Sequence, residues 1–215
     1  MNTNNKYVIT INRELGSGGR TVGRKLAEKL GVEYYDKALA LALQEKYHLS
    51  SEELERLKGQ ENGWWADFKR KLAGANADDV FYITKMGSEP EVLETEAVFR
   101  AETEILKAIA KDGSCVIAGR SAFYVFRDHP NHLNVLIQAS MLHRMARVAR
   151  EQNMSKEEAL YTIEKVDQMR ENYVTKFTRT SRYDARNYQL VINMDELSEE
   201  DAVELIMEYI RKMSK

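Results

Sequence analysis

The chain has 215 residues, of which 43% are hydrophobic and 31% charged, with only two prolines, and this is the composition of a folded globular protein. It excludes a collagen-like or broadly disordered chain. The 32 basic and 34 acidic residues nearly cancel, so the charge does not favour general binding to nucleic acid. The single cysteine, Cys115, excludes an internal disulfide framework and a zinc site built from several cysteines.

Membrane and metal partners are not indicated by the sequence. No apolar run approaches the roughly 20 residues needed to cross a bilayer, and the run at residues 7–11 is too short for a signal-peptide core. The four histidines share no metal-ligand spacing, so we expect no metal site built by the protein itself. We therefore expect a reduced, cytoplasmic protein with no membrane or nucleic-acid partner.

The first predicted unit is a strand, a glycine-rich turn and a helix. Tyr7–Ile11 is short, apolar and β-branched, which is typical of a buried strand. The turn Gly16-Ser-Gly-Gly19 follows it. Residues 21–30 then carry apolar side chains at helical spacing, and Gly31 provides a stop. Residues 32–35 predict a second short strand.

The middle of the chain is predicted to be helical around one irregular segment. Residues 38–57 predict two helices, and residues 91–111 predict a long one with apolar side chains on one face. Residues 58–90 contain several glycines and the pair Trp64-Trp65, and they predict an insertion or cap. Three interpretations of the two tryptophans remain open: they pack a small local core, they stack on a base, or they form a surface through which two copies of the chain pair as a homodimer.

The last part of the chain predicts three more strands, at Cys115–Ala118, Leu133–Ile137 and Gln189–Asn193. Helices are predicted near residues 141–151, 156–172 and 198–213. Strands separated by helices imply a parallel sheet with right-handed crossovers. The predicted fold class is therefore α/β, a single domain over residues 1–215 with a five-stranded parallel sheet flanked by helices.

The glycine turn is the first candidate binding site. Ligands of open parallel sheets bind at the carboxyl ends of the strands, and Gly16, Ser17, Gly18 and Gly19 lie at such an end. Backbone N–H groups of a glycine turn converge on an anion, and a helix N-terminus adds partial positive charge. Many turns between a strand and a helix contain glycine for steric reasons alone, so the interpretation as a phosphate site needs support from further residues.

Several segments together resemble the cytidylate-kinase-like branch of the P-loop nucleoside monophosphate kinases. They are Asn12–Gly23 with Lys25–Gly31, Val116-Ile-Ala-Gly-Arg120, Ala139-Ser140 with Arg144 and Arg147, the D-x-x-R pattern Asp167-Gln-Met-Arg170, and Asn187–Leu197 with the closing helix. The likeness covers little of residues 58–90. It implies a P-loop kinase-type three-layer sandwich, with residues 58–90 as an acceptor-side insertion and residues 144–186 as an arginine-rich helical lid.

The resemblance also implies the activity and the ligands. ATP with Mg²⁺ would be the phosphoryl donor, bound by residues 16–21 (Gly16, Ser17, Gly18, Gly19, Arg20 and Thr21), and a nucleoside monophosphate would be the acceptor. The acceptor-binding residues that it implies are Arg120, Asp167 and Arg170. Asp36, at the end of the second predicted strand, is a further candidate that orients the acceptor or magnesium, or is simply a turn residue. Lys37 and Ala42 stand where the family has a hydroxyl residue and an arginine, so the identity of the acceptor stays open.

The glycine turn departs from the usual P-loop, G-x-x-x-x-G-K-[ST], whose lysine reaches the β- and γ-phosphates. Arg13 stands at the first glycine position, Gly19 at the lysine position and Arg20 at the hydroxyl position, with Thr21 one place late. A guanidinium group offers a planar fork for phosphate oxygens. We therefore expect Arg13, Arg20 or both to replace the lysine.

Seven arginines lie between residues 144 and 186. Convergent arginines stabilise the charge of a phosphoryl group in transfer, and Arg147 and Arg170 are the strongest candidates for this catalytic role. A solvated helix face with neighbouring glutamates would explain any one of them equally well. Two functions remain: an ATP-dependent nucleotide kinase, or a non-catalytic nucleotide-binding regulatory protein that kept the fold and lost the lysine.

Overall fold

The computed structural model describes residues 1–36, 96–119 and 121–214. The chain divides into two compact units, Met1–Asp36 with Ile105–Lys215, and Lys37–Glu104. The predicted helices at 38–57, the insertion at 58–90 with Trp64-Trp65, and Arg120 lie outside the described residues. The first unit contains the sheet and the glycine turn.

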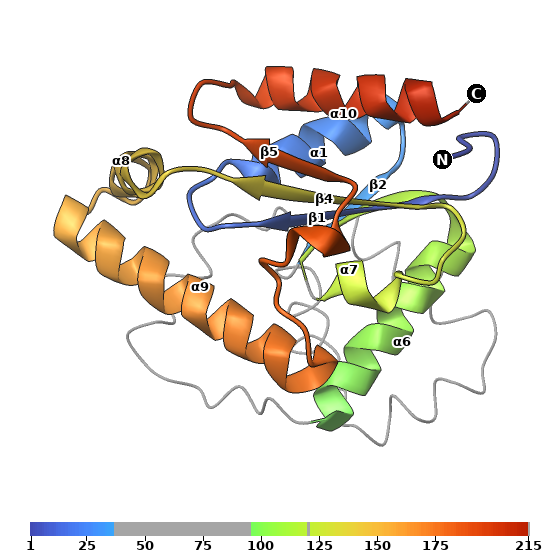
Figure 1. Ribbon diagram of the computed structural model, residues 1–215, viewed down its shortest axis with the longest axis horizontal. Helices are drawn as coiled ribbons and strands as arrows, with labels where there is room; N and C mark the ends of the chain where they lie inside the picture. Colours follow the sequence, from blue (N-terminus) through green and yellow to red (C-terminus); the bar gives the residue numbers. More distant parts are fainter. Residues whose placement is uncertain (37–95, 120, 215) are drawn as a thin grey trace. The chain divides into compact units, whose positions relative to one another are not determined.

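The sheet has five parallel strands in the order β2-β3-β1-β4-β5, and it confirms the five strands predicted from the sequence (Figure 1). They are β1 (Val8–Arg13), β2 (Glu33–Asp36), β3 (Cys115–Ala118), β4 (His132–Gln138) and β5 (Leu190–Asn193). The central strand β1 pairs with β3 on one side and β4 on the other. The turn after β1 therefore lies at the middle of the carboxyl edge, where ligands of such sheets bind.

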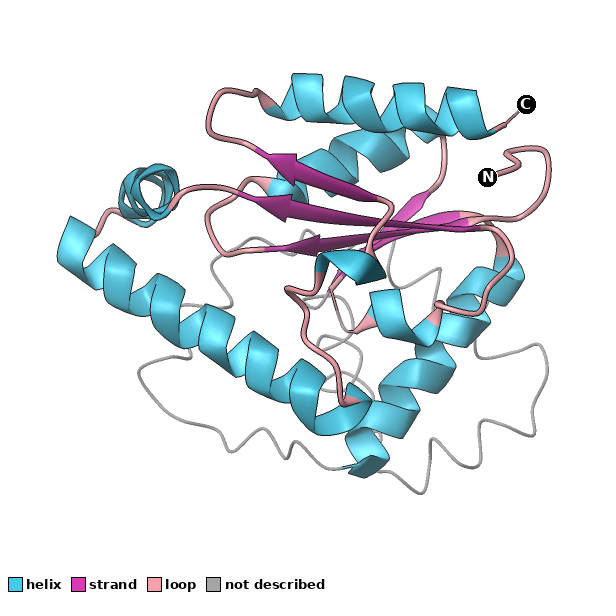
Figure 2. Ribbon diagram, in the orientation of Figure 1, coloured by secondary structure: helices cyan, strands magenta, loops and turns pink. Residues whose placement is uncertain are grey.

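Helices cover both faces of the sheet, which makes the three-layer α/β arrangement of a P-loop kinase-type fold (Figures 1 and 2). One face carries α1 (Gly19–Leu30) and α10 (Glu199–Met213), and the other carries α7 (Ala122–Val125) and α9 (Lys156–Thr178). The remaining elements are α6 (Glu96–Asp112), α8 (Met141–Gln152) after β4, and the 3-10 turn η1 (Ala185–Asn187).

The core follows the two-residue period of the strands. Ile9 and Ile11 of β1 are fully buried in one cluster with Leu26 of α1 and Ile206 of α10. Leu136 of β4 belongs to a second cluster with side chains of α7 and α9. Successive residues of a strand point to opposite faces, so both layers of helices are held by the same strands.

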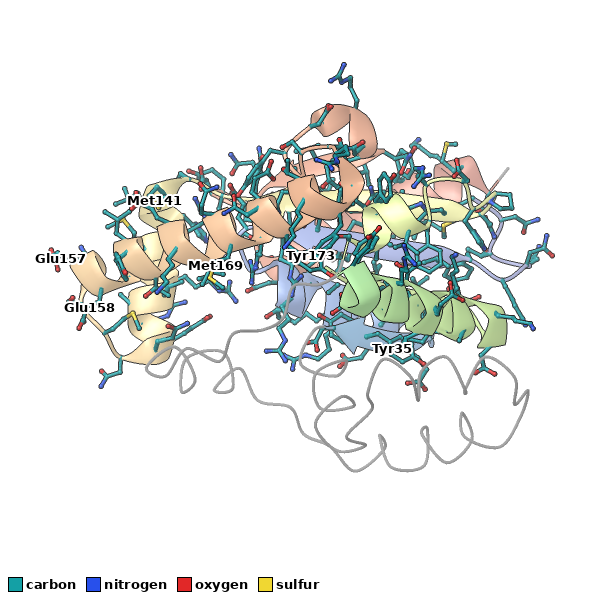
Figure 3. All side chains as sticks on the ribbon, turned by 90° about the horizontal axis from the view of Figure 1, so that it is seen from below. Tyr35, Met141, Glu157, Glu158, Met169 and Tyr173 are labelled. Carbon is teal, nitrogen blue, oxygen red and sulfur yellow. The ribbon has the colours of Figure 1, made fainter. Side chains whose placement is uncertain are left out.

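Helix α9 is longer than the sequence predicts, since it continues from Lys156 to Thr178 rather than ending near residue 172. Figure 3 shows it running from Glu157 and Glu158 in its first turn past Tyr173. Acidic side chains in a first turn match the positive end of the helix dipole. The helices α7 and η1 were not predicted, because elements of three or four residues carry too few side chains to show a period.

Candidate active site

Residues 14–18 join β1 to α1 and contain most of the glycine turn, which ends at the first residue of α1, Gly19. Ser17 is fully buried, and both its N–H and its hydroxyl donate to the Glu14 carbonyl, at 3.3 and 2.9 Å. Gly16 and Gly18 both have a φ near +80°, a conformation that favours glycine. The turn is thus closed internally by Ser17 and shaped by two left-handed glycines.

Helix α1 begins without a side-chain cap. Its N-cap residue is Gly18, which has no side chain to accept a hydrogen bond from the first turn, and that turn contains no acidic residue. Uncapped N–H groups at a helix N-terminus, together with the helix dipole, form a binding site for anions. The helices α8, α9 and α10 instead each begin at a serine whose hydroxyl accepts a hydrogen bond from the first turn. The N-terminus of α1 is therefore suited to phosphate.

Arg13, the last residue of β1, runs between two glycines. A Cβ atom on Gly19 would lie 2.5 Å from the Cβ atom of Arg13, and one on Gly119, at the end of β3, would overlap the Arg13 guanidinium group. Within residues 1–36, 96–119 and 121–214, no carboxylate pairs with this half-buried side chain. The central strand thus ends in a cation that has no acidic partner among the described residues, next to the N-terminus of α1.

Arg20, the other candidate for the lysine role, is paired with Asp36. The Arg20 Nε atom lies 2.8 Å from the Asp36 Oδ2 atom, and the Asp36 side chain is only 8% exposed. This ion pair joins the first turn of α1 to the end of β2. The two residues that the sequence assigns to the donor and acceptor sites therefore contact each other, and Arg20 is less available to phosphate than Arg13.

Arg147 of α8 lies against the glycine turn at Gly18. Its Nη1 atom is 2.8 Å from where a Cβ atom on Gly18 would stand. The guanidinium pairs with Glu199 at 2.6 Å and Glu151 at 2.8 Å. Burial is the largest single influence on Glu199 and raises its pKa, but the hydrogen bond from Arg147, a backbone hydrogen bond and the charges of Arg147 and Lys25 together bring the pKa below its usual value. Glu199 is therefore a carboxylate that holds Arg147 at the turn.

Asp167 and Arg170 of α9 reach the same turn from below the sheet. Asp167 Oδ1 accepts the Leu15 N–H at 3.1 Å, and Arg170 Nη1 lies 3.4 Å from both Asp167 Oδ1 and the Arg13 carbonyl. Arg144 and Arg182 also pair with Asp167. The D-x-x-R pattern therefore meets the backbone of the turn.

The structure brings most of the sequence-predicted residues to one edge of the sheet. Arg13, Arg147, Arg170 and Asp167 meet at the glycine turn of residues 16–19. Thr21 follows in the first turn of α1, and Arg20 and Asp36 form a separate pair next to the turn. Arg120 lies outside the described residues. In the part of the chain that is described, no group of three histidine, cysteine or carboxylate side chains could hold a metal ion, and no helix is long and apolar enough to cross a membrane.

Two residues at the site, Glu14 and Glu199, carried no signal in the sequence, and a third, Arg182, was one of the seven clustered arginines but was not singled out. Glu14 accepts the Ala139 N–H, Glu199 holds Arg147, and Arg182 is buried beneath the turn. Glu199 follows a helix-capping serine and reads as an ordinary acidic first-turn residue. Arg182 lies in an irregular segment, and nothing local distinguishes it from the exposed Arg186.

Comparisons with solved structures agree with the fold. The chain is similar to an uncharacterised protein from Eubacterium ventriosum, with 22% identity, a TM-score of 0.65, and 95% of this chain and 98% of that chain covered. It is similar to TT1252 from Thermus thermophilus, with 21% identity, a TM-score of 0.52, and 97% and 98% covered. It also resembles shikimate kinase from Bacteroides thetaiotaomicron, with 18% identity, a TM-score of 0.50, and 95% and 98% covered.

Identities of this size establish the fold and not the substrate. No curated protein matched the chain. A model of the cytidylate kinase-like family matches residues 8–196, which include all five strands and the glycine turn. With this match and a sheet and helix arrangement of the kinase type, the chain belongs to the cytidylate kinase-like family.

Proposed function

We propose that the chain is an ATP-dependent kinase of a nucleoside monophosphate or a related small molecule, in which Arg13 replaces the P-loop lysine. The observation that carries this proposal is the position of Arg13. A side chain at residue 19, where the lysine usually stands, would start 2.5 Å from the Arg13 Cβ atom. Side chains at positions 13 and 19 therefore exclude each other, and here the arginine at position 13 provides the cation.

The chemistry requires positioning and charge stabilisation rather than a nucleophile from the protein. The N-terminus of α1, which has a glycine as its N-cap, fits the donor phosphates, with Arg147 next to Gly18 and Arg13 next to Gly19. Mg²⁺ binds phosphate oxygens and keeps several waters, so the ion would arrive with ATP. Thr21, one place after the usual P-loop hydroxyl position, is the proposed hydroxyl ligand. Arg170 and Arg120 are the proposed contacts of the acceptor and the transferred phosphoryl group.

Binding of negatively charged phosphate groups would explain why the guanidinium groups of Arg13, Arg147 and Arg170 gather at this edge of the sheet. Negative charge spreads over the oxygens of the transferred group, and fixed guanidinium groups stabilise it without having to reorganise. A cytoplasmic location, where ATP and nucleoside monophosphates are present, fits this proposal. So does the single buried cysteine, since burial raises the pKa of the Cys115 thiol to about 12 and keeps it unreactive.

A phosphoryl-transfer screen tests the proposal. Purified protein is incubated with ATP–Mg²⁺ and each of the common nucleoside monophosphates, and product is quantified for the wild type and for Arg13→Ala. Removing a cation aimed at developing charge costs about 10²- to 10³-fold in kcat. The matched control is Arg211→Ala, an exposed arginine near the end of α10, which should keep wild-type activity.

The alternative is a non-catalytic nucleotide-binding protein, favoured only by the missing lysine. If ATP–Mg²⁺ raises the melting temperature but no acceptor is phosphorylated, the binding-only function is correct. If neither ATP nor pyrophosphate changes the melting temperature, both functions are wrong. Activity that is unchanged in Arg13→Ala would show that this arginine does not replace the lysine.

A further inference from the structure

Residues 13–15, which precede the glycine turn, are hydrogen-bonded through their backbone to buried charged side chains. Asp167 of α9 is 7% exposed, and its Oδ1 atom accepts the Leu15 N–H at 3.1 Å. Leu15 immediately precedes Gly16, where the chain enters the left-handed conformation. A buried carboxylate from a helix 152 residues away thus fixes one backbone group at the entry to the turn.

Arg182 fixes a second group of the same backbone. It is 1% exposed, and its Nη2 atom donates to the Asn12 side-chain oxygen at 3.1 Å and to the Arg13 carbonyl. The Arg182 carbonyl in turn accepts the Tyr188 hydroxyl at 2.6 Å. The position of the arginine is therefore set from both of its ends, and it reaches the last carbonyl of β1.

Arg144 of α8 completes the arrangement. Its Nη1 atom lies 2.6 Å from Asp167 Oδ2 and 3.4 Å from the Leu15 carbonyl. The Arg144 carbonyl also lies 2.8 Å from where a Cβ atom on Gly16 would stand, so α8 packs directly on the turn. Backbone groups of Arg13 and Leu15 are consequently bound by α8, α9 and the segment after α9.

The two oxygens of Asp167 are occupied by these contacts. Oδ1 receives the Leu15 N–H and lies 3.4 Å from Arg170 and 3.6 Å from Arg182, and Oδ2 receives Arg144. A carboxylate has about four acceptor sites, so little capacity is left for a substrate. Burying charged groups is costly unless they are paired, and here the pairing is directed at the backbone of the turn.

The geometry points to Asp167 and Arg182 as positioning residues that hold the glycine turn in its anion-binding shape. They act through the backbone of Arg13 and Leu15, and not by touching the acceptor. This differs from the acceptor contact that the family resemblance implies for Asp167. The inference rests on the proposed function, because it concerns the site where donor phosphates would bind.

The test measures polyphosphate binding without an acceptor. The dissociation constant of pyrophosphate is measured by calorimetry for the wild type and Asp167→Asn, at a temperature where circular dichroism shows both to be folded. The amide keeps the shape of the carboxylate but loses its charge. Losing one charge-assisted contact on a binding backbone is expected to weaken pyrophosphate binding about ten-fold or more.

The matched control is Asp184→Asn. Asp184 also accepts a backbone N–H, from Arg186 at 3.0 Å, and also pairs with an arginine, but it caps η1 and does not contact the turn. This variant should bind pyrophosphate like the wild type. Arg182→Lys is the second test variant, since one ammonium group cannot keep both the Asp167 and the Arg13 contacts, and it should also weaken binding.

The outcomes separate this inference from the proposed function. If the wild type does not bind pyrophosphate, the proposed function fails. If the wild type binds it and Asp167→Asn and Arg182→Lys bind it equally well, the positioning role alone is wrong. With an active acceptor in hand, a positioning role raises the KM for ATP in Asp167→Asn, whereas an acceptor contact raises only the KM for the acceptor.

Discussion

Arg13 and Gly19 are complementary residues. The glycine leaves the space through which the arginine side chain passes, and Gly119 leaves the space for its guanidinium group. Ile137 of β4 also approaches Gly19, at 3.0 Å from a Cβ atom placed there. Protein interiors have few voids, so a larger residue at position 19 has to displace one of these neighbours.

This complementarity predicts an effect of restoring the lysine. Gly19→Lys alone should lower the free energy of unfolding by about 1–3 kcal/mol, because the new side chain collides with Arg13. The double variant Arg13→Gly/Gly19→Lys, which also removes the Cβ atom of residue 13, should recover much of that loss and bind pyrophosphate more tightly than Arg13→Gly. Urea denaturation and calorimetry measure both quantities.

Gly113→Lys is the control for this prediction, since a Cβ atom at Gly113 meets nothing within 4 Å. It should leave the free energy of unfolding almost unchanged. Equal destabilisation in Gly19→Lys and in the double variant would mean that Arg13 does not fill the space of the lysine.

Helix α9 supplies Asp167 and Arg170 to the site, and its stability depends on the cap of its first turn. The Ser155 hydroxyl accepts the Glu158 N–H at 3.2 Å, and the Glu158 carboxylate accepts the Ser155 N–H at 2.8 Å. These hydrogen bonds hold the pKa of Glu158 below its usual value. A reciprocal capping box satisfies two N–H groups that the helix cannot satisfy itself.

We expect Ser155→Ala to lower the free energy of unfolding by about 1 kcal/mol, because the first turn of α9 loses its cap. Ser155→Asp, which can still accept the N–H bond, should stay close to the wild type. Thermal denaturation followed by circular dichroism measures the difference. An alanine variant as stable as the aspartate variant would contradict a stabilising cap.

At the scale of the whole molecule, a polar network inside the sheet couples stability to pH. Asn134 donates its amide to the Asn187 carbonyl, so its oxygen faces Thr10 and accepts the Thr10 hydroxyl at 2.6 Å. His132 Nε2 lies 2.7 Å from the same hydroxyl oxygen, and it must therefore be the donor in this pair. Burial lowers the pKa of His132 to about 4, so the ring stays neutral.

The depressed pKa fixes the sign of the pH dependence. Between pH 6.5 and about 4 the unfolded chain binds a proton at His132 and the folded chain does not, so stability falls as the pH falls. The size of this effect is on the order of 2 kcal/mol. His132→Gln should flatten the pH dependence of urea unfolding over this window.

His143→Gln serves as the control for the histidine prediction, since His143 lies on α8 near Asp195 and outside the sheet. Its pH profile should follow that of the wild type. If His132→Gln loses stability toward pH 4 as steeply as the wild type does, other groups cause the acid sensitivity.

The sequence by itself determined the fold of this protein. The β-branched runs, the glycine turn and the serine caps are local signals whose physical causes act within a few residues, so the five parallel strands and the glycine turn at the end of β1 followed from them. The family resemblance added the kinase type of the fold. Local signals also explain what was missed, since α7 and η1 are too short to show a period.

Only the tertiary structure decided which arginine has no acidic partner within the described residues. Arg13 and Arg20 look equivalent in the sequence, but Arg20 meets Asp36 across 16 residues and Arg13 passes between Gly19 and Gly119. The partners of Asp167 lie up to 152 residues away. Side-chain pairing over such distances depends on how the helices pack on the sheet, and no short-range pattern encodes it.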